Sequence, residues 1–590
     1  MSKDALGKEQ ETVQPLTFPA DMLPVDRMDP GKCQLAGLFR QFLHFGREER
    51  SFLMYIPQKA HYNCPCIIAA CPDGTAPWEF LGQSGLKGLA DEEELFVCLP
   101  EPKGAVWELN GRDADFIGCV YQKILNRDYY VLMQDCIYAM GFAEGATVIQ
   151  QAAMKMTSEW SGMASFGSFY PQVMWCRDAS LAAPQGEAGG ELVMSAEKCQ
   201  LPVWMFFKKT DFWTEQVCEY WMRQNQSQKE ALRGRWDTRI YLPERIKEGS
   251  RVNDDAISQT RMTEGYDQSW LTAGLLKEVW EFLGSARRHR GFGHKILRWY
   301  RQPEACGAVK RTMEVDGIRR EWYEYIPQRL ARAGEKMPLV AVLHGRGGDG
   351  ESFFDITDMS VQAAERGFAA VFPTADFYQM RDGGLKNVRL WNGSFEGERI
   401  DSLHFIRKMV EDVCARWSID TRRIYVCGQS SGGYMALCCA MAASDLFAAA
   451  VSWSGYCCFD DAMPIFKYPY EACFQAGRVP VCMMFGEKDL LFNISSLQPF
   501  PKEGGAALNY IRFLIHRLEL EPDPWVYACH PVTYYVWHTP AGIPLLKIGI
   551  VADMPHANYP EESRIAYDEW FAWFSKSERG ECCYMGEVLR

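Results

Sequence analysis

Ser430 stands in a pattern that suits a nucleophile. The segment Ile424–Met441 reads as an apolar strand, then Gly428-Gln429-Ser430-Ser431-Gly432, then a helix of small residues. The flanking glycines allow a sharp turn, which presents the serine hydroxyl above the N-terminus of the following helix. A serine hydroxyl reacts only when a neighbouring base removes its proton and a third group orients that base. A lone Gly-x-Ser-x-Gly also arises by chance, but the strand, turn and helix together favour a catalytic Ser430.

Asp489 and His556 have the types and positions of the orienting acid and the base. Asp489 follows the strand Pro480–Phe485, and His556 follows the last long strand, Leu545–Asp553, ahead of the final helix. In mostly parallel sheets, active-site groups lie at the carboxyl ends of the strands, so we expect both residues to meet Ser430 at one edge. The alternatives are ordinary surface carboxylates and structural histidines: Asp460, Asp461, Glu487, His516, His530 and His538.

Serine chemistry also needs N–H groups aimed at the oxygen that becomes negative in the transition state. One donor should be the N–H of Ser431, directly after the nucleophile. The second should come from the glycine-rich loop His344–Gly348, where the N–H of Arg346 is the candidate. We expect His344 to hold this loop rather than to act as a base.

The first half of the chain carries a faded copy of the second. Ile137–Met154 repeats the segment around Ser430 but has Ala143 in the serine position. Two further pairs follow in the same order, Tyr55–Gln58 with Tyr325–Gln328 and Pro202–Asp211 with Pro480–Asp489. Three collinear pairs predict a duplication in which loops have changed length.

The first copy lacks the chemical groups of the second. Asp211 keeps the acid position, but Ala143 replaces the nucleophile, and a comparison of Ile257–Asp267 with Ile548–Asn558 sets Gly265 opposite His556. The segment Cys71-Pro72-Asp73-Gly74 replaces the glycine-rich loop. We therefore expect an inactive first copy with a role as a scaffold, as a lid, or in a homo-oligomer assembled through it.

The chain of 590 residues is too long for one ordinary core and suits two domains. Short β-branched runs alternate with helical patterns, which predicts the α/β class with a mostly parallel sheet flanked by helices in each domain. The predicted organisation is an extended arm over residues 1–34, a degenerate domain over 35–285, a basic linker over 286–308 and a catalytic domain over 309–590. We expect the linker to be partly helical with a solvated face, and the chain to end in a helix around Trp570.

Composition excludes several classes of function. A net charge of −13 disfavours nucleic acid as the main partner, and no apolar run is long enough to predict a membrane span. The polar start, MSKDALGKEQETVQP, lacks the apolar core of a secretory signal. The 22 cysteines, several of them adjacent, are expected to be reduced thiols in a cytoplasmic protein.

The second domain resembles the polyhydroxybutyrate depolymerase/feruloyl esterase family of α/β-hydrolases. The resemblance covers most of residues 310–575 and rests on these motifs: His344-Gly345-x-Gly347-Gly348, Trp391-Asn392, Ile419-Asp420-x-x-Arg423-Ile424-Tyr425-Val426, Gly428-x-Ser430-x-Gly432-Gly433-x-Met435, Asp489, and His556 followed by Pro560. It implies two tandem α/β-hydrolase domains, one degenerate, and hydrolysis of carboxylic esters through an acyl-enzyme. By the same resemblance Trp391 and Tyr434 lie near the acyl or alcohol pocket, although Trp391 could equally be a core aromatic.

Family members that degrade polymer are commonly secreted and disulfide-bonded, and this chain has no recognisable export signal or polymer-binding module. The expected substrate is therefore a small or oligomeric ester of feruloyl or 3-hydroxybutyryl type, with no metal or organic cofactor. Two other functions stay open at this point. One is a serine peptidase that uses the same three residues, and the other is a non-catalytic scaffolding or binding protein.

Overall fold

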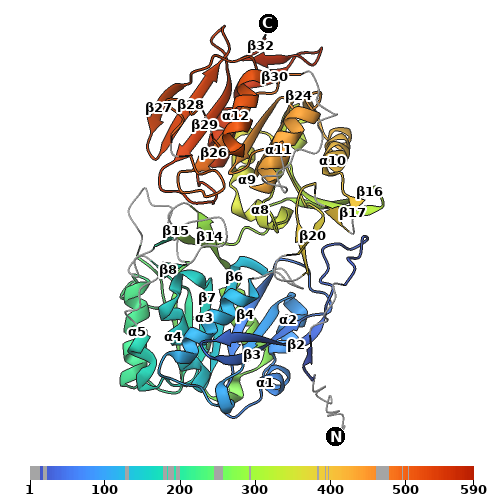
Figure 1. Ribbon diagram of the computed structural model, residues 1–590. Coiled ribbons are helices and arrows are strands. Elements are labelled where there is room, and N and C mark those ends of the chain that lie inside the picture. The colour runs from blue at the N-terminus through green and yellow to red at the C-terminus, as the bar shows by residue number, and fades with distance from the viewer. Residues whose placement is uncertain are drawn as a thin grey trace.

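The computed structural model describes residues 14–17, 23–125, 132–176, 182–183, 192–193, 199–244, 257–291, 294–381, 385–392, 394–395, 398–459, 477–494, 496–502 and 504–589. Two large sheets dominate it, one built from the first half of the chain and one from the second (Figure 1). We call the parts of the chain built on them the N-terminal unit and the C-terminal unit.

The two sheets share one strand order. The first runs β1 (Leu16–Thr17), β2 (Gly37–Phe45), β3 (Glu48–Ile56), β5 (Phe96–Pro100), β4 (Cys64–Ala70), β6 (Leu132–Phe142), β7 (Gly162–Phe166), β10 (Val203–Phe207), β13 (Thr260–Glu264), β12 (Arg239–Tyr241) and β11 (Leu232–Arg233). The second runs β16 (Val309–Val315), β17 (Ile318–Tyr325), β19 (Ala369–Pro373), β18 (Met337–Leu343), β24 (Ile419–Gln429), β25 (Ala449–Trp453), β26 (Val481–Gly486), β29 (Pro544–Val551), β28 (Val532–His538) and β27 (Trp525–Cys529). Apart from β1, each strand of the first sheet has a counterpart at the same place in the second, as the repeat predicts.

The six central strands of each sheet are parallel, from β5 to β13 and from β19 to β29. Helices pack on these sheets as α1 (Pro77–Gln83), α2 (Leu86–Glu93), α3 (Arg112–Ile124), α4 (Glu144–Lys155), α5 (Phe212–Gln224) and α6 (Ala273–Leu283) in the N-terminal unit. The C-terminal unit has α7 (Gln328–Ala333), α8 (Gly350–Ile356), α9 (Met359–Arg366), α10 (Ser402–Arg416), α11 (Ser431–Ala442), α12 (Ala506–Arg517) and α13 (Glu562–Asp568). The predicted α/β class, with mostly parallel sheets flanked by helices, is confirmed.

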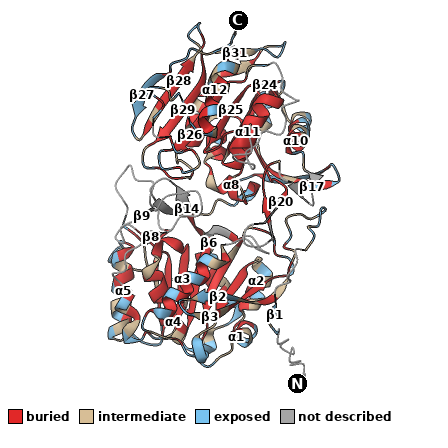
Figure 2. Cartoon of the chain, in the orientation of Figure 1, coloured by how far each residue is buried: buried red, intermediate tan, exposed pale blue. Residues whose placement is uncertain are grey.

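Burial follows this layered arrangement, with the central strands buried in both units (Figure 2). Along β4, Cys66 and Ile68 join one apolar cluster, whereas Ile67 and Ala69 join another. Successive side chains of a strand point to opposite faces, so both faces of the sheet are covered. Parallel strands buried on both faces need continuous apolar sequence, which β4 and β18 provide.

Two expectations about local structure are wrong. The basic segment after residue 285 forms the antiparallel hairpin of β14 (Ala286–Gly291) and β15 (His294–Trp299), not a helix. Its Arg288 is buried and donates to the carbonyl oxygens of Trp160 and Gln200, so this part of the linker is not a solvated face. Near the C-terminus α13 stops at Asp568, and a small sheet follows with strands β30 (Phe574–Lys576), β31 (Cys582–Tyr584) and β32 (Glu587–Val588).

The cysteines of the described part of the chain are free thiols. In those same residues, no helix has both the length and the apolar character that crossing a membrane would require.

Candidate active site

Ser430 sits on the turn between β24 and α11, where the chain reverses sharply. Its φ of 53° and ψ of −115° lie in a sparsely populated region that costs a non-glycine residue about 1–3 kcal/mol. The Ser430 N–H donates to the carbonyl of Trp453 on β25 at 2.7 Å, which holds the turn against its neighbour. A side chain at Gly432 would collide with the carbonyls of Leu343 and His344, so the motif's glycine serves close approach of α11 to β18.

The structure brings the predicted acid and base together at the same sheet edge. Asp489 follows β26, His556 follows β29, and His556 Nδ1 lies 2.9 Å from Asp489 Oδ2. Asp489 is 1% exposed, and its Oδ1 accepts from the N–H of Leu491 at 3.0 Å, so the carboxylate is fixed from two sides. The other ring nitrogen, His556 Nε2, lies 3.5 Å from Nε2 of Gln429, the residue before Ser430.

The Ser430 hydroxyl itself has no hydrogen bond to any residue that the structure describes. The hydrogen bond between a nucleophile and its base is often long without substrate and shortens in the reacting complex. The competing histidines lie elsewhere, with His516 inside α12, His538 at the end of β28 and His530 between β27 and β28. Asp460 and Asp461 lie outside the described residues.

The loop after β18 forms a tight turn around Arg346. The N–H of Gly348 donates to the carbonyl of Gly345 at 3.1 Å, and Gly347 takes a φ of 77°, which glycine adopts readily. Arg346 occupies the first corner of this turn. Ser431 is the first residue of α11, where N–H groups have no acceptor within the helix. The turn and the helix start are thus the two segments from which the sequence predicts oxyanion donors.

His344 anchors the turn and does not reach the reacting residues. Its Nε2 accepts from the N–H of Ala375 at 2.9 Å, which places the ring proton on Nδ1, 2.7 Å from the carbonyl of Gly345. Burial lowers the pKa of His344 to about 4, so the ring is neutral near pH 7. This is the structural role expected from the sequence.

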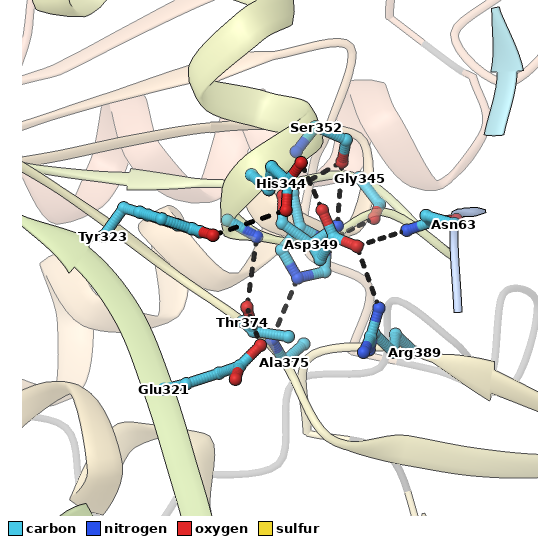
Figure 3. A network of polar contacts seen from close by, with 12 residues as sticks. Asn63, Glu321, Tyr323, His344, Gly345, Asp349, Ser352, Thr374, Ala375 and Arg389 are labelled. Carbon is cyan, nitrogen blue, oxygen red and sulfur yellow. Dashed lines mark hydrogen bonds and ion pairs between the residues drawn. The ribbon is translucent and has the colours of Figure 1, made fainter. Parts of the chain in front are cut away.

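Asp349, directly beyond the turn, is the centre of a buried polar network (Figure 3). Its Oδ1 accepts from the N–H of Ser352 at 2.8 Å and caps α8, and its Oδ2 accepts from Arg389 at 3.0 Å. Burial alone would raise the pKa of Asp349, but the Arg389 guanidinium and the hydrogen bonds outweigh it and lower the pKa. The carbonyl of Arg389 in turn accepts from the N–H of Gly347 at 2.8 Å. The network is therefore joined to the turn through Asp349, which follows the turn, and through Arg389, which binds Gly347 within it.

The N-terminal unit takes part in this network. Asn63, just before β4, donates from Nδ2 to Asp349 Oδ2 at 2.6 Å (Figure 3). Next to it the Phe377 ring packs 5.0 Å from the Tyr62 ring and belongs to an apolar cluster of the N-terminal unit. Sequence reasoning missed Asn63 and Asp349, because contacts across hundreds of residues leave no local signal.

The two residues predicted to line a substrate pocket are buried. Trp391 has no exposed surface and donates from its indole nitrogen to the carbonyl of His344 at 2.8 Å, and Tyr434 is 1% exposed. Trp391 therefore supports the turn as a core aromatic. A role for either side chain in binding substrate stays a prediction.

The corresponding turn of the N-terminal unit keeps its backbone but not its chemistry. Ala143 has a φ of 50° and a ψ of −118°, and its N–H donates to the carbonyl of Phe166 at 2.8 Å, as Ser430 does to Trp453. Asp211 caps α5 by accepting from the N–H of Thr214 at 2.8 Å.

Strand register corrects the sequence comparison at the histidine position. Phe207 pairs with Glu264, and Phe485 pairs with Ile550, so Gly265 corresponds to Val551 and not to His556. The loop that follows, residues 266–271 with sequence YDQSWL, takes the place of the loop that carries His556. It contains no histidine, so the unit still lacks a base there. Within the described residues no cluster of histidine, cysteine and acidic side chains is suited to hold a metal ion.

Comparisons with known proteins find similarity to esterases. Residues 322–466 match the family model described as Esterase PHB depolymerase. Feruloyl esterase B of Neurospora crassa is 30% identical over 154 residues, which are 26% of this chain and 50% of that protein. Acetylxylan esterase A of Emericella nidulans is 25% identical over 135 residues, which are 23% of this chain and 41% of that protein. The chain thus spans half or less of these relatives' length.

Solved structures similar to this chain include the acetyl xylan esterase from Aspergillus awamori, with a TM-score of 0.33 and 16% identity over 45% of this chain and 99% of that one. Another is a ferulic acid esterase from Anaeromyces mucronatus, with a TM-score of 0.28 and 14% identity over 47% of this chain and 90% of that one. The resemblance of the C-terminal region to esterases of this family, first indicated by its motifs, is confirmed by the family model and the sequence relatives.

Proposed function

We propose that the protein is a serine-dependent carboxylic ester hydrolase that works through an acyl-enzyme. The observation that carries the proposal is the pairing of His556 with the buried Asp489 at the sheet edge where the strained turn presents Ser430. A base held by a buried carboxylate is an arrangement that can make a serine hydroxyl nucleophilic near neutral pH. The two sequence relatives named above, which are esterases by name, support the proposal.

In the proposed reaction Ser430 Oγ attacks the ester carbonyl carbon while its proton passes to His556 Nε2. Asp489 accepts from Nδ1–H, fixes the tautomer and stabilises the imidazolium that forms. The N–H groups of Ser431 and Arg346 bind the oxyanion. The intermediate then collapses, His556 protonates the leaving alcohol, and a water molecule activated by the same histidine releases the acid from Ser430.

The substrate follows from the relatives only as a class. Feruloyl and acetylxylan esterases act on the esters in their names, and we propose a small or oligomeric ester of feruloyl or 3-hydroxybutyryl type for this chain. We further propose that residues 35–285 and 309–590 are separate domains, the first inactive because it has Ala143 and no histidine after β13.

Steady-state kinetics with matched substrates test the proposal. The purified chain should hydrolyse an aryl ester, and Ser430→Ala should lower kcat by on the order of 10⁶-fold, as removal of such a nucleophile does elsewhere. Comparison of the ester with the matching anilide separates an esterase from a peptidase. A panel of hydroxycinnamoyl, acetyl and 3-hydroxybutyryl esters then identifies the acyl group. Turnover by the Ser430→Ala chain at the wild-type rate would refute the assignment.

A further inference from the structure

The N-terminal unit holds a cavity of about 460 Å³ directly over Ala143. It lies at the edge of the first sheet that corresponds to the edge of the second sheet where Ser430 stands. We call it the Ala143 pocket, and residues from the turns after β4, β6, β7, β10 and β13 contribute to its wall. Its size is within the range of sites that bind small organic molecules. Six of its lining residues carry the argument: Phe80, Phe142, Glu144, Phe166, Tyr170 and Lys208.

Register identifies the residues of this pocket that correspond to the proposed oxyanion donors. Ala70 pairs with Gly141, as Leu343 pairs with Gly428, so Asp73 corresponds to Arg346. Glu144, the first residue of α4, corresponds to Ser431.

Glu144 Oε2 accepts from the N–H of Asp73 at 3.2 Å. The protein's own carboxylate therefore occupies the donor that an oxyanion or a ligand carboxylate would need, and its charge repels both.

The Glu144 carboxylate selects for a hydrogen-bond donor. Its Oε1 accepts from the Tyr170 hydroxyl at 3.1 Å, and Oε2 accepts from Asp73, which leaves one lone pair on each oxygen. A group that faces Glu144 from inside the cavity should thus carry an O–H or N–H. At the mouth, exposed Lys208 and Asp267 have opposite charges that offset one another, so they select little for ligand charge.

The apolar wall selects for a flat ring. The Phe142 and Phe166 rings stack with centroids 4.9 Å apart and an interplanar angle of 2°, and Phe80 leans on Phe142 at 4.8 Å. All three side chains are at least 95% buried, so these rings are fixed by packing. Phe166 stacks in turn on Phe206 at 4.7 Å, so the ring faces are used within the stack and the cavity meets ring edges. An aromatic ligand suits such a wall because aromatic rings favour edge contact.

We propose that the Ala143 pocket binds, without converting it, a planar aromatic molecule with a hydroxyl group, that is, a phenol. The ring contacts the edges of the packed phenylalanine rings, and the hydroxyl donates to the Glu144 carboxylate. This site is separate from Ser430 and does not depend on ester hydrolysis there. The site gives the N-terminal unit a binding function. That function needs the turn and the pocket but not a nucleophile or a base.

Isothermal titration calorimetry on the full chain tests the site. The protein carries Ser430→Ala, and the probes are 4-ethylphenol and 4-ethylfluorobenzene, which are nearly equal in size but differ in the donor. We expect 4-ethylphenol to bind roughly 10- to 100-fold more tightly, the ratio that a hydrogen bond to a charged group gives. Equal affinities, or no binding of the phenol at millimolar concentration, would overturn the proposal.

Three further substitutions in that background locate the binding. Ala143→Leu fills the cavity from its floor and should abolish binding of 4-ethylphenol, whereas the matched control Ala143→Ser keeps the volume and should bind as the parent does. Glu144→Gln keeps the shape and should bring the two probes close to equal affinity. Circular dichroism checks folding, and if Ala143→Leu does not fold, Glu144→Gln decides alone. Binding unaffected by Ala143→Leu would place the phenol elsewhere and refute the assignment.

Discussion

Removal of the Asn63 side chain should slow catalysis in a unit to which Asn63 does not belong. Asn63 donates at 2.6 Å to Asp349, which is buried directly beyond the turn that carries Arg346. Asn63→Ala removes this donor but leaves Arg389 at 3.0 Å and the Ser352 N–H at 2.8 Å, so Asp349 stays charged and partly held. A hydrogen bond to a charged group contributes about 1.5–3 kcal/mol.

The size of the change in kcat depends on how much of this hydrogen-bond energy is lost in the transition state. Complete loss of one oxyanion donor costs on the order of 10²–10³ in kcat, and Asn63→Ala only loosens the segment that positions such a donor. If about 1.4 kcal/mol of the lost interaction reaches the transition state, kcat falls about tenfold. KM should change little, because Asn63 acts through Asp349 and is not among the residues proposed to bind the substrate.

The assay is steady-state hydrolysis of an aryl ester, with Gln34→Ala as the matched control. Gln34 accepts from Asn387 at 2.9 Å across the same boundary between the units but does not contact Asp349. Gln34→Ala should therefore keep the wild-type kcat. A wild-type kcat in Asn63→Ala, or an equal loss in both variants, would refute the link between the N-terminal unit and the turn.

Three further outcomes are expected. The kcat/KM for an aryl ester should fall on acidification, because a protonated His556 cannot accept the Ser430 proton, and a flat pH profile would argue against histidine as the base. The free energy of unfolding should fall as pH drops from 6.5 towards 4, because the buried His344 takes up its proton only near pH 4 while the unfolded chain does so near 6.5; denaturant titrations should show this slope weakened in His344→Gln. Ala143→Ser in a Ser430→Ala background should show no aryl-ester turnover, since the Glu144 carboxylate accepts the N–H of Asp73 and the loop after β13, residues 266–271, has no histidine; measurable turnover would contradict this.

The features that sequence predicted well are those with local causes. The turn at Ser430 needs glycines where α11 approaches β18, and these glycines stand close to Ser430 in the sequence. Asp489 and His556 could be placed because parallel strands end at one edge, so a residue just past a strand end has a known location. The three collinear pairs predicted that the two units repeat one another, and the two sheets do share one strand order.

The features that sequence missed depend on contacts between distant segments. A comparison of residue types set Gly265 opposite His556. The correct correspondence follows only from the pairing of β13 with β10 in the fold. The basic residues near Arg288 suggested a solvated linker, because nothing nearby in sequence indicates that Arg288 donates to the carbonyls of Trp160 and Gln200. Asn63 and Glu144 are ordinary polar residues until the fold brings Asp349 and Asp73 to them.

Covalent labelling tests the central claim most directly. The intact chain would be treated with a fluorophosphonate, digested, and analysed by mass spectrometry to locate the modified residue. A phosphonylated serine is the mark of a nucleophile activated by a neighbouring base. We expect label on Ser430 alone, lost in Ser430→Ala and strongly reduced in His556→Ala, whose nucleophile is no longer activated. An unlabelled Ser430 in folded wild-type protein, or equal labelling without His556, would contradict the account.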